Sequence, residues 1–181
     1  MGKILTEIDN NLQFWISKQQ MFFVATAPLS TNGHINCSPK GADSFRVIDP
    51  QTVAYQDLTG SGIETIAHLQ ENGRIVIMFC AFEGAPQIVR LHGTGTTLFQ
   101  DSADYQQIAK LFQPHPGERS IIKIDVQRIA TSCGYSVPLY DYVDGRDVLD
   151  KWTEQKSPEE LAAYRQKNNQ LSIDGLPGLL F

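Results

Sequence analysis

The sequence predicts a mainly β fold, a small antiparallel barrel with flanking helices. Short runs of β-branched and aromatic residues recur along the chain, and many of them are separated by only a few turn-forming residues. The helical patterns between these runs are short, so they do not form the regular alternation of strands and long helices that a parallel sheet requires. About six closely spaced strands of this kind favour a barrel with antiparallel strands.

The chain begins with a predicted amphipathic helix. The pattern from Thr6 to Gln20 has Thr6 as its expected N-cap, and Ile8, Leu12 and Ile16 fall on one face. The period then changes, and strands are expected at residues 22–27, 34–38, 44–48, 52–55, 74–82, 87–99 and 120–130. Two further helices are expected at residues 62–71 and 101–112.

The last part of the chain has a different character. Residues 140–150 are polar and acidic, and Ser157, Pro158 and Glu160 together predict a helix start with a capping box. We therefore expect a barrel domain with its N-terminal helix over residues 1–140. Residues 141–181 are expected to form a helical extension whose apolar tail packs on the barrel or on a partner subunit.

Composition excludes several classes of protein. The chain has 181 residues, enough for one domain with a real core, and a net charge of −5 that argues against a nucleic-acid partner. Its three cysteines are widely separated, so we expect neither a disulfide framework nor a metal site. We expect no signal peptide and no membrane span, and hence a cytoplasmic protein.

Two polar loops carry the strongest functional signal. The first is Ser38-Pro39-Lys40-Gly41, which puts a cation beside a hydroxyl group. The second is Thr59-Gly60-Ser61-Gly62, which opens the expected helix at 62–71. Backbone N–H groups at a helix start are unpaired and lie at the positive end of the helix dipole, which suits a phosphate group.

The order of these elements resembles the pyridoxamine 5′-phosphate oxidase-like family of split barrels that bind flavin mononucleotide (FMN). The resemblance covers roughly residues 20–140 and includes Ser132-Cys133-Gly134-Tyr135 after the last strand. It implies a six-stranded antiparallel split barrel, a homodimer with FMN at its interface, and flavin-dependent oxidoreductase activity on a small substrate that the sequence does not identify.

The resemblance also implies which residues bind the cofactor. Three of them, Tyr55, Gln56 and Asp57, are on the strand whose end contacts the flavin and its ribityl chain. The phosphate side consists of Thr59, Gly60, Ser61, Gly62 and Thr65. The cation that reaches the phosphate is Lys40, with Ser38 beside it, or Arg46. No catalytic acid or base is assigned.

The chain departs from the family pattern at the start of its second helix. Oxidases of the family typically carry an Arg-Lys pair where this chain has Glu64 and Thr65, and the basic C-terminal residues that hold a pyridoxal-type substrate have no clear match. The resemblance therefore does not extend to the vitamin B6 oxidase reaction itself. Two alternatives stay open: a non-catalytic flavin carrier or sensor, and a split barrel for another cofactor such as haem or a deazaflavin.

Overall fold

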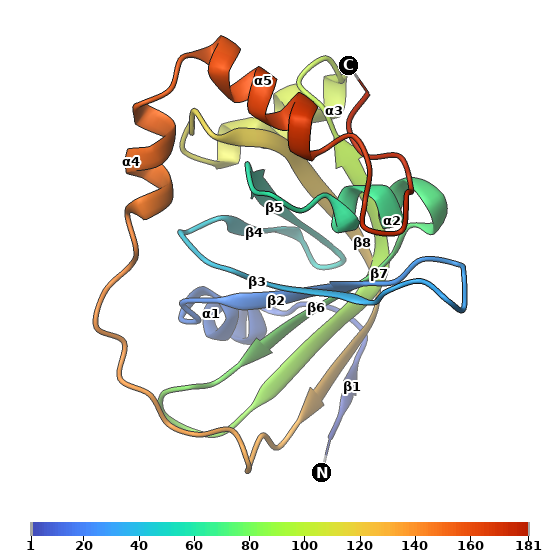
Figure 1. Ribbon diagram of the computed structural model, residues 1–181. Coiled ribbons are helices and arrows are strands. Elements are labelled where there is room, and N and C mark those ends of the chain that lie inside the picture. Colours follow the sequence, from blue (N-terminus) through green and yellow to red (C-terminus); the bar gives the residue numbers. More distant parts are fainter. Residues whose placement is uncertain (1, 181) are drawn as a thin grey trace.

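The computed structural model describes residues 2–180 and shows one antiparallel sheet that curls around a core, with helices at its margins (Figure 1). The strands are β1 (Ile4–Leu5), β2 (Phe22–Thr26), β3 (Asn36–Lys40), β4 (Phe45–Asp49), β5 (Thr52–Leu58), β6 (Arg74–Cys80), β7 (Ile88–Leu98) and β8 (Glu118–Ser132). The helices are α1 (Asn10–Ser17), α2 (Glu64–Asn72), α3 (Ala103–Ile108), α4 (Val148–Glu154) and α5 (Pro158–Asn168), with a 3₁₀ turn, η1, at Ala109–Leu111.

The sheet does not close into a complete barrel. Its strand order is β3-β2-β6-β7-β8-β5-β4, so β3 and β4 are the two free edges, and β1 pairs separately with β8. This arrangement confirms the predicted split barrel with antiparallel strands. The described residues form eight strands, against the six of the expected barrel and the seven strand segments expected along the chain. The additional strand is β1, which is only two residues long and carries little sequence signal.

The longest strand holds the two halves of the sheet together. Strand β8 spans 15 residues and pairs with β1, β5 and β7. It is longer than the expected strand at 120–130 because its start, around Glu118, continues the ladder with β5, while its end continues the ladder with β7. Its early residues therefore pair with the end of β5, beside the start of α2.

An aromatic cluster fills the inside of the curled sheet. The Phe22 ring lies 5.0 Å from Phe45 and 5.6 Å from Tyr55 between centroids, and Phe79 lies 5.0 Å from Phe45. These rings come from β2, β4, β5 and β6, and Phe22, Tyr55 and Phe79 are almost completely buried. Buried aromatic pairs of this kind supply much of the packing energy of a small core.

The first helix is shorter than the sequence predicts. It begins at Asn10 because the side chain of Asp9, rather than Thr6, accepts the capping bond from Leu12 N at 2.7 Å. Just before it, Ile8 N donates to Pro50 O at 2.8 Å, which ties the approach to the β4–β5 turn. The capping box at Ser157 is confirmed in full at the start of α5.

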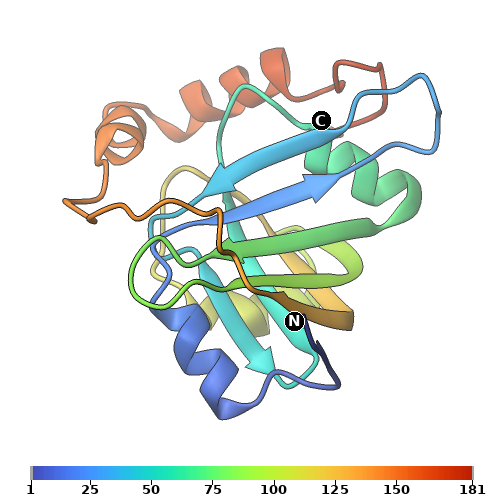
Figure 2. The ribbon, with the colours of Figure 1, turned by 90° about the horizontal axis from the view of Figure 1, so that it is seen from below.

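The C-terminal helices and tail lie along the edge of the barrel rather than inside it. Figures 1 and 2 show α4 and α5 beside the open side of the sheet, with the tail returning to the start of α2. The tail is fixed there by hydrogen bonds from Asn169 Nδ2 to Gly60 O at 3.0 Å and from Ile173 N to Glu64 Oε1 at 3.3 Å. The chain segment after residue 168 thus contacts the second polar loop, residues 59–62, and the start of α2.

Candidate functional site

A small pocket lies where β3, β5, β8 and the start of α2 meet. We call it the α2 pocket; its volume is about 130 Å³. The residues that line it share a polar or loop character and are Asn36, Ser38, Lys40, Asp57, Leu58, Gly60, Gly62, Ile63, Glu64, Thr65, Ile66 and Arg119. Strands β3 and β5 belong to opposite ends of the strand order, so the pocket spans the split in the barrel.

The start of α2 presents free backbone amides to this pocket. No side chain caps the helix, because its N-cap position is occupied by the apolar residue Ile63. The first intrahelical hydrogen bond runs from Ala67 N to Ile63 O at 3.0 Å, so the amides of Glu64, Thr65 and Ile66 precede it. An uncapped helix start carries a partial positive charge and favours an anion.

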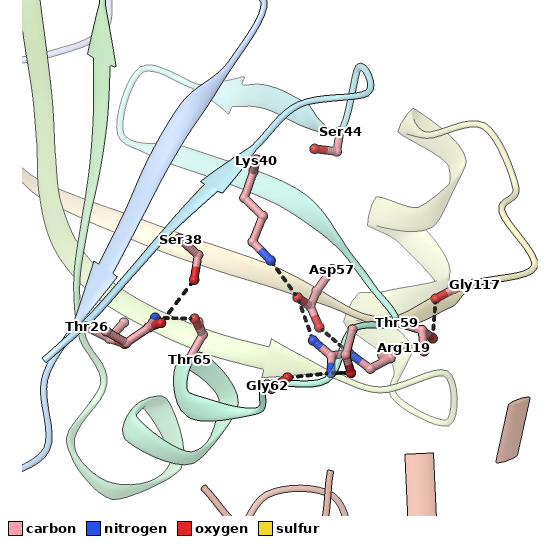
Figure 3. A network of polar contacts seen from close by, with 12 residues as sticks. Thr26, Ser38, Lys40, Ser44, Asp57, Thr59, Gly62, Thr65, Gly117 and Arg119 are labelled. Carbon is pink, nitrogen blue, oxygen red and sulfur yellow. Dashed lines mark hydrogen bonds and ion pairs between the residues drawn. The ribbon is translucent and has the colours of Figure 1, made fainter. Parts of the chain in front are cut away.

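A buried ion pair crosses the floor of the pocket (Figure 3). Asp57 on β5 accepts hydrogen bonds from Arg119 Nε at 3.0 Å and Nη2 at 3.3 Å, and Lys40 Nζ lies 3.5 Å from its Oδ1. The Asp57 side chain is 2% exposed and that of Arg119 is 5% exposed, whereas Lys40 keeps 24% exposure. Lys40 therefore joins β3 to β5 and is the cation of this network that still reaches solvent.

The guanidinium of Arg119 has little capacity left for a ligand. Besides Asp57, its Nη1 donates to Gly62 O at 2.8 Å and to Asn169 Oδ1 at 3.0 Å. Buried arginine paired with a carboxylate and with carbonyl oxygens holds backbone segments in place. Arg119 thus fixes the loop before α2 in position.

A second polar chain runs from the pocket into the protein. Ser38 Oγ donates to Asn36 Oδ1 at 3.0 Å, and Asn36 Nδ2 donates to Thr65 Oγ1 at 3.0 Å and to Thr26 Oγ1 at 3.3 Å. Thr26 Oγ1 is hydrogen-bonded to Nδ1 of the fully buried His68 at 2.9 Å. Burial lowers the pKa of His68, so this chain ends in a neutral imidazole at neutral pH.

Glu64 is the feature that opposes an anion. Its carboxylate lies at the rim of the pocket, beside the amides of its own helix start, and accepts the hydrogen bond from Ile173 N. The pocket lining therefore carries two cations, Lys40 and Arg119, and two carboxylates, Asp57 and Glu64. Because Asp57 is occupied by Arg119, the balance at the mouth depends on Lys40, Glu64 and the helix dipole.

The structure brings together six of the residues that the sequence singled out. They line the α2 pocket and are Ser38, Lys40, Asp57, Gly60, Gly62 and Thr65. Residues that sequence reasoning missed are Asn36 and Arg119. Arg119 could have been suspected, because the charged pair Glu118-Arg119 lies just before the run Ile121-Ile122 at the start of a strand.

Five of the predicted residues lie outside the lining of the pocket. Arg46 is bound to Asp43 at 2.9 Å and to the Leu111 carbonyl at 2.9 Å, and its guanidinium covers the Phe112 ring at 5.1 Å. Tyr55 is fully buried in the aromatic cluster. Of the two cations that the sequence could not rank, only Lys40 lies at the pocket.

The other three make contacts around the pocket rather than in it. Gln56 Nε2 is hydrogen-bonded to Glu118 and to Gln113 O. Thr59 Oγ1 donates to Gly117 O at 2.7 Å and accepts from Arg165 Nε at 2.9 Å. Ser61 is exposed, and its carbonyl accepts from Asn169 Nδ2 at 3.4 Å.

The described residues offer neither a metal site nor a membrane-spanning helix. Among residues 2–180, no three or more His, Cys, Asp or Glu side chains are grouped so that they could hold a metal ion. In the same part of the chain, no helix has the length and apolar character needed to cross a membrane.

The open antiparallel sheet with helices at its margins defines the class of split barrels. The sequence pattern of the pyridoxamine 5′-phosphate oxidase family matches residues 8–133. The chain is also 41% identical, over 95% of its length and 76% of the relative's, to the pyridoxamine 5′-phosphate oxidase family protein ustO of Aspergillus flavus. The chain therefore belongs to the pyridoxamine 5′-phosphate oxidase family.

Solved structures agree on the fold. HupZ of Group A Streptococcus is 26% identical and superposes with a TM-score of 0.55, over 69% of this chain and 99% of that one. A Clostridium acetobutylicum protein related to general stress protein 26, of the pyridoxinephosphate oxidase family, is 14% identical with a TM-score of 0.52. The superposition covers 70% of this chain and 91% of the Clostridium chain.

Proposed function

We propose that this chain binds FMN with its phosphate in the α2 pocket and acts as a flavin-dependent oxidoreductase. The observation that carries the proposal is the uncapped start of α2, which opens into a pocket beside the partly exposed ammonium of Lys40. Membership of the pyridoxamine 5′-phosphate oxidase family makes FMN the specific candidate among phosphate-bearing ligands.

The residues present fit a phosphate group. The Ser38 hydroxyl, the Lys40 ammonium and the amides at the start of α2 are donors that line one pocket, and a volume of about 130 Å³ accommodates a phosphate but not a whole flavin. The chain's own part is to bind and orient the cofactor. The bound flavin would supply hydride or electron exchange with an organic substrate.

A homodimer is part of the same proposal. A shallow apolar surface over β2 and β6 includes Ala25, Ile75 and Val76, and Ile35 beside it is 77% exposed. Exposed apolar surface of this kind is typical of an interface. A second subunit here would leave the flavin ring in a groove between chains, while the phosphate is held within one chain.

The test begins with the chromophore. Protein purified from cells should show a flavin absorbance spectrum, and the molecule released on denaturation should be identified as FMN by chromatography and mass. Titration of the stripped protein with FMN should quench the flavin fluorescence. A colourless protein that leaves FMN fluorescence unchanged would contradict the proposal, and a Soret band would replace FMN with haem.

Turnover separates an enzyme from a carrier. Oxidation of a reduced nicotinamide cofactor by the FMN-loaded protein should exceed that of the same amount of free FMN. A rate equal to that of free FMN would support the flavin carrier or sensor instead. Light scattering should give twice the monomer mass, and Ile35→Glu should lower it if the apolar surface is the interface.

A further inference from the structure

A second and larger hollow lies under the C-terminal helix and tail. We call it the α5 cavity; its volume is about 490 Å³, within the usual range for small-molecule sites. It shares only Arg119 with the lining of the α2 pocket. Its other walls come from Gln70 of α2, from α5, from the β7–α3 connection and from the tail.

One cation in this cavity lacks an anionic partner. Arg165 is half-buried, and its Nε donates to Thr59 Oγ1 at 2.9 Å. Among residues 2–180 it forms no ion pair, and within the same residues its two Nη groups donate to no acceptor. Burial, and then the nearby guanidinium of Arg119, lower its pKa, while Asp57 and Glu118 act in the opposite direction. A guanidinium has five N–H donors, so most of the hydrogen-bonding capacity of Arg165 is unused.

The neighbouring arginine does not relieve this surplus of donors. Arg119 is already occupied by Asp57, by Asn169 and by the carbonyl of Gly62. The same carboxylate of Asp57 also faces Lys40 at 3.5 Å. Lys40 and Arg119 therefore share the buried carboxylate of Asp57. Arg165 has Asp57 and Glu118 in its surroundings, but within residues 2–180 neither carboxylate forms a salt bridge with it, and its side chain lines the α5 cavity.

The rest of the cavity is partly apolar. Phe99 and Leu179 pack against the core from this side, and Leu180 is 90% exposed. The carboxylate of Asp101 also lies in the lining and is exposed to solvent. It repels any anion, but a phosphate dianion about twice as strongly as a monocarboxylate at the same distance.

We propose that the α5 cavity binds an organic monocarboxylate with an apolar body. Its carboxylate pairs with the free Nη groups of Arg165, and its hydrocarbon part lies against Phe99, Leu179 and Leu180. This site is separate from the α2 pocket and does not depend on whether that pocket binds FMN.

Isothermal titration calorimetry with 3-phenylpropionate on the full chain tests the proposal. We expect saturable binding of the acid, and no binding of 3-phenylpropionamide, which has the same shape without the charge. Inorganic phosphate should bind at least about tenfold more weakly than the acid, because it has no apolar body. Equal binding of acid and amide, or phosphate binding as tightly as the acid, would overturn the proposal.

Two variants and a control locate the binding site. Arg165→Gln should weaken 3-phenylpropionate binding by about tenfold or more, because it removes a charge-assisted pair. Lys167→Gln, on the exposed side of the same helix, should leave it unchanged. If Arg165→Gln does not fold, Leu180→Ser at an exposed position should still weaken binding of the acid. Unchanged affinity in Arg165→Gln, or in Leu180→Ser, refutes the assignment.

Discussion

The α2 pocket and the α5 cavity share the side chain of Arg119, but the other residues that line them differ in chemical character. The α2 pocket is small, and is made by barrel strands and a helix start, with donors on most sides. The α5 cavity is larger and combines polar side chains with three apolar ones, Phe99 after β7 and Leu179 and Leu180 in the tail. The comparison shows that one buried arginine can stand between two hollows of different chemistry. This is possible here because the N–H groups of Arg119 are already hydrogen-bonded within the protein.

The largest expected effect comes from removing the charge that pairs with Arg119, the residue that lines both hollows. Asp57→Asn leaves Arg119 buried without a counter-ion, and should lower the free energy of unfolding by about 3–5 kcal/mol. Urea denaturation followed by circular dichroism measures the loss. Asp43→Asn is the matched control, because the Asp43 side chain is 82% exposed in its pair with Arg46. That control should change stability by less than about 1 kcal/mol. Equal losses would mean that Asp57 is not a special counter-ion.

The two hollows should bind their ligands independently. Lys40→Gln should raise the dissociation constant of FMN by about tenfold, since a charge-assisted contact to the phosphate is lost. Fluorescence titration measures it, and Arg46→Gln serves as the control that leaves FMN binding unchanged. Binding of 3-phenylpropionate should be the same in Lys40→Gln as in the unmodified protein. If Arg46→Gln raised the dissociation constant of FMN more than Lys40→Gln, the phosphate would have to be assigned to Arg46.

A smaller change in the opposite direction is expected at the rim of the α2 pocket. Glu64→Gln removes a negative charge beside the proposed phosphate position and should tighten FMN binding by about fivefold, corresponding to roughly 1 kcal/mol of repulsion. The gain should shrink as salt is added, because charges near the surface are screened. Weaker binding in Glu64→Gln would show that the carboxylate helps to hold the ligand.

The smallest expected effect concerns the tail that reaches both hollows. The hydrogen bonds that the side chain and backbone of His34 make to Asp174, at 2.6 and 2.7 Å, lower the pKa of the carboxyl below 3.8. Its contribution to stability is therefore present above pH 3.8 and is lost as the pH falls through the lowered value. As the pH falls below 3.8, the melting temperature of Asp174→Asn should therefore decrease less steeply than that of the unmodified protein. An identical profile would show that the tail is held without this contact.

Local features of the fold could be predicted from the sequence because their causes are local. The capping box of Ser157 and Glu160 lies within four consecutive residues, and the structure reproduces it. Gly73, which ends α2 with φ 71°, follows the helical pattern directly. The start of α1 was misplaced because Thr6 and Asp9 are both acceptable caps, and only the contact of Ile8 with the β4–β5 turn distinguishes them.

The candidate site could be predicted only in part, because its electrostatics depend on distant residues. Lys40 and Arg46 both lie in or beside short strands, and sequence alone could not show that Asp43 and the Leu111 carbonyl occupy Arg46. Asp57 and Arg119 are 62 residues apart and meet only because β5 pairs with β8. Such a pair has no sequence spacing by which to recognise it.

The apolar N-cap of α2 has a consequence for how this protein can change by mutation. Ile63 is 2% exposed, and a Cβ added to Gly178 of the tail would lie 2.6 Å from its side chain. A serine or aspartate at position 63 would cap the helix but would also remove the surface on which the tail rests. A side chain at position 63 that caps the free amides of α2 would therefore lose packing energy against the tail. Selection for stability alone would for this reason leave the start of α2 uncapped.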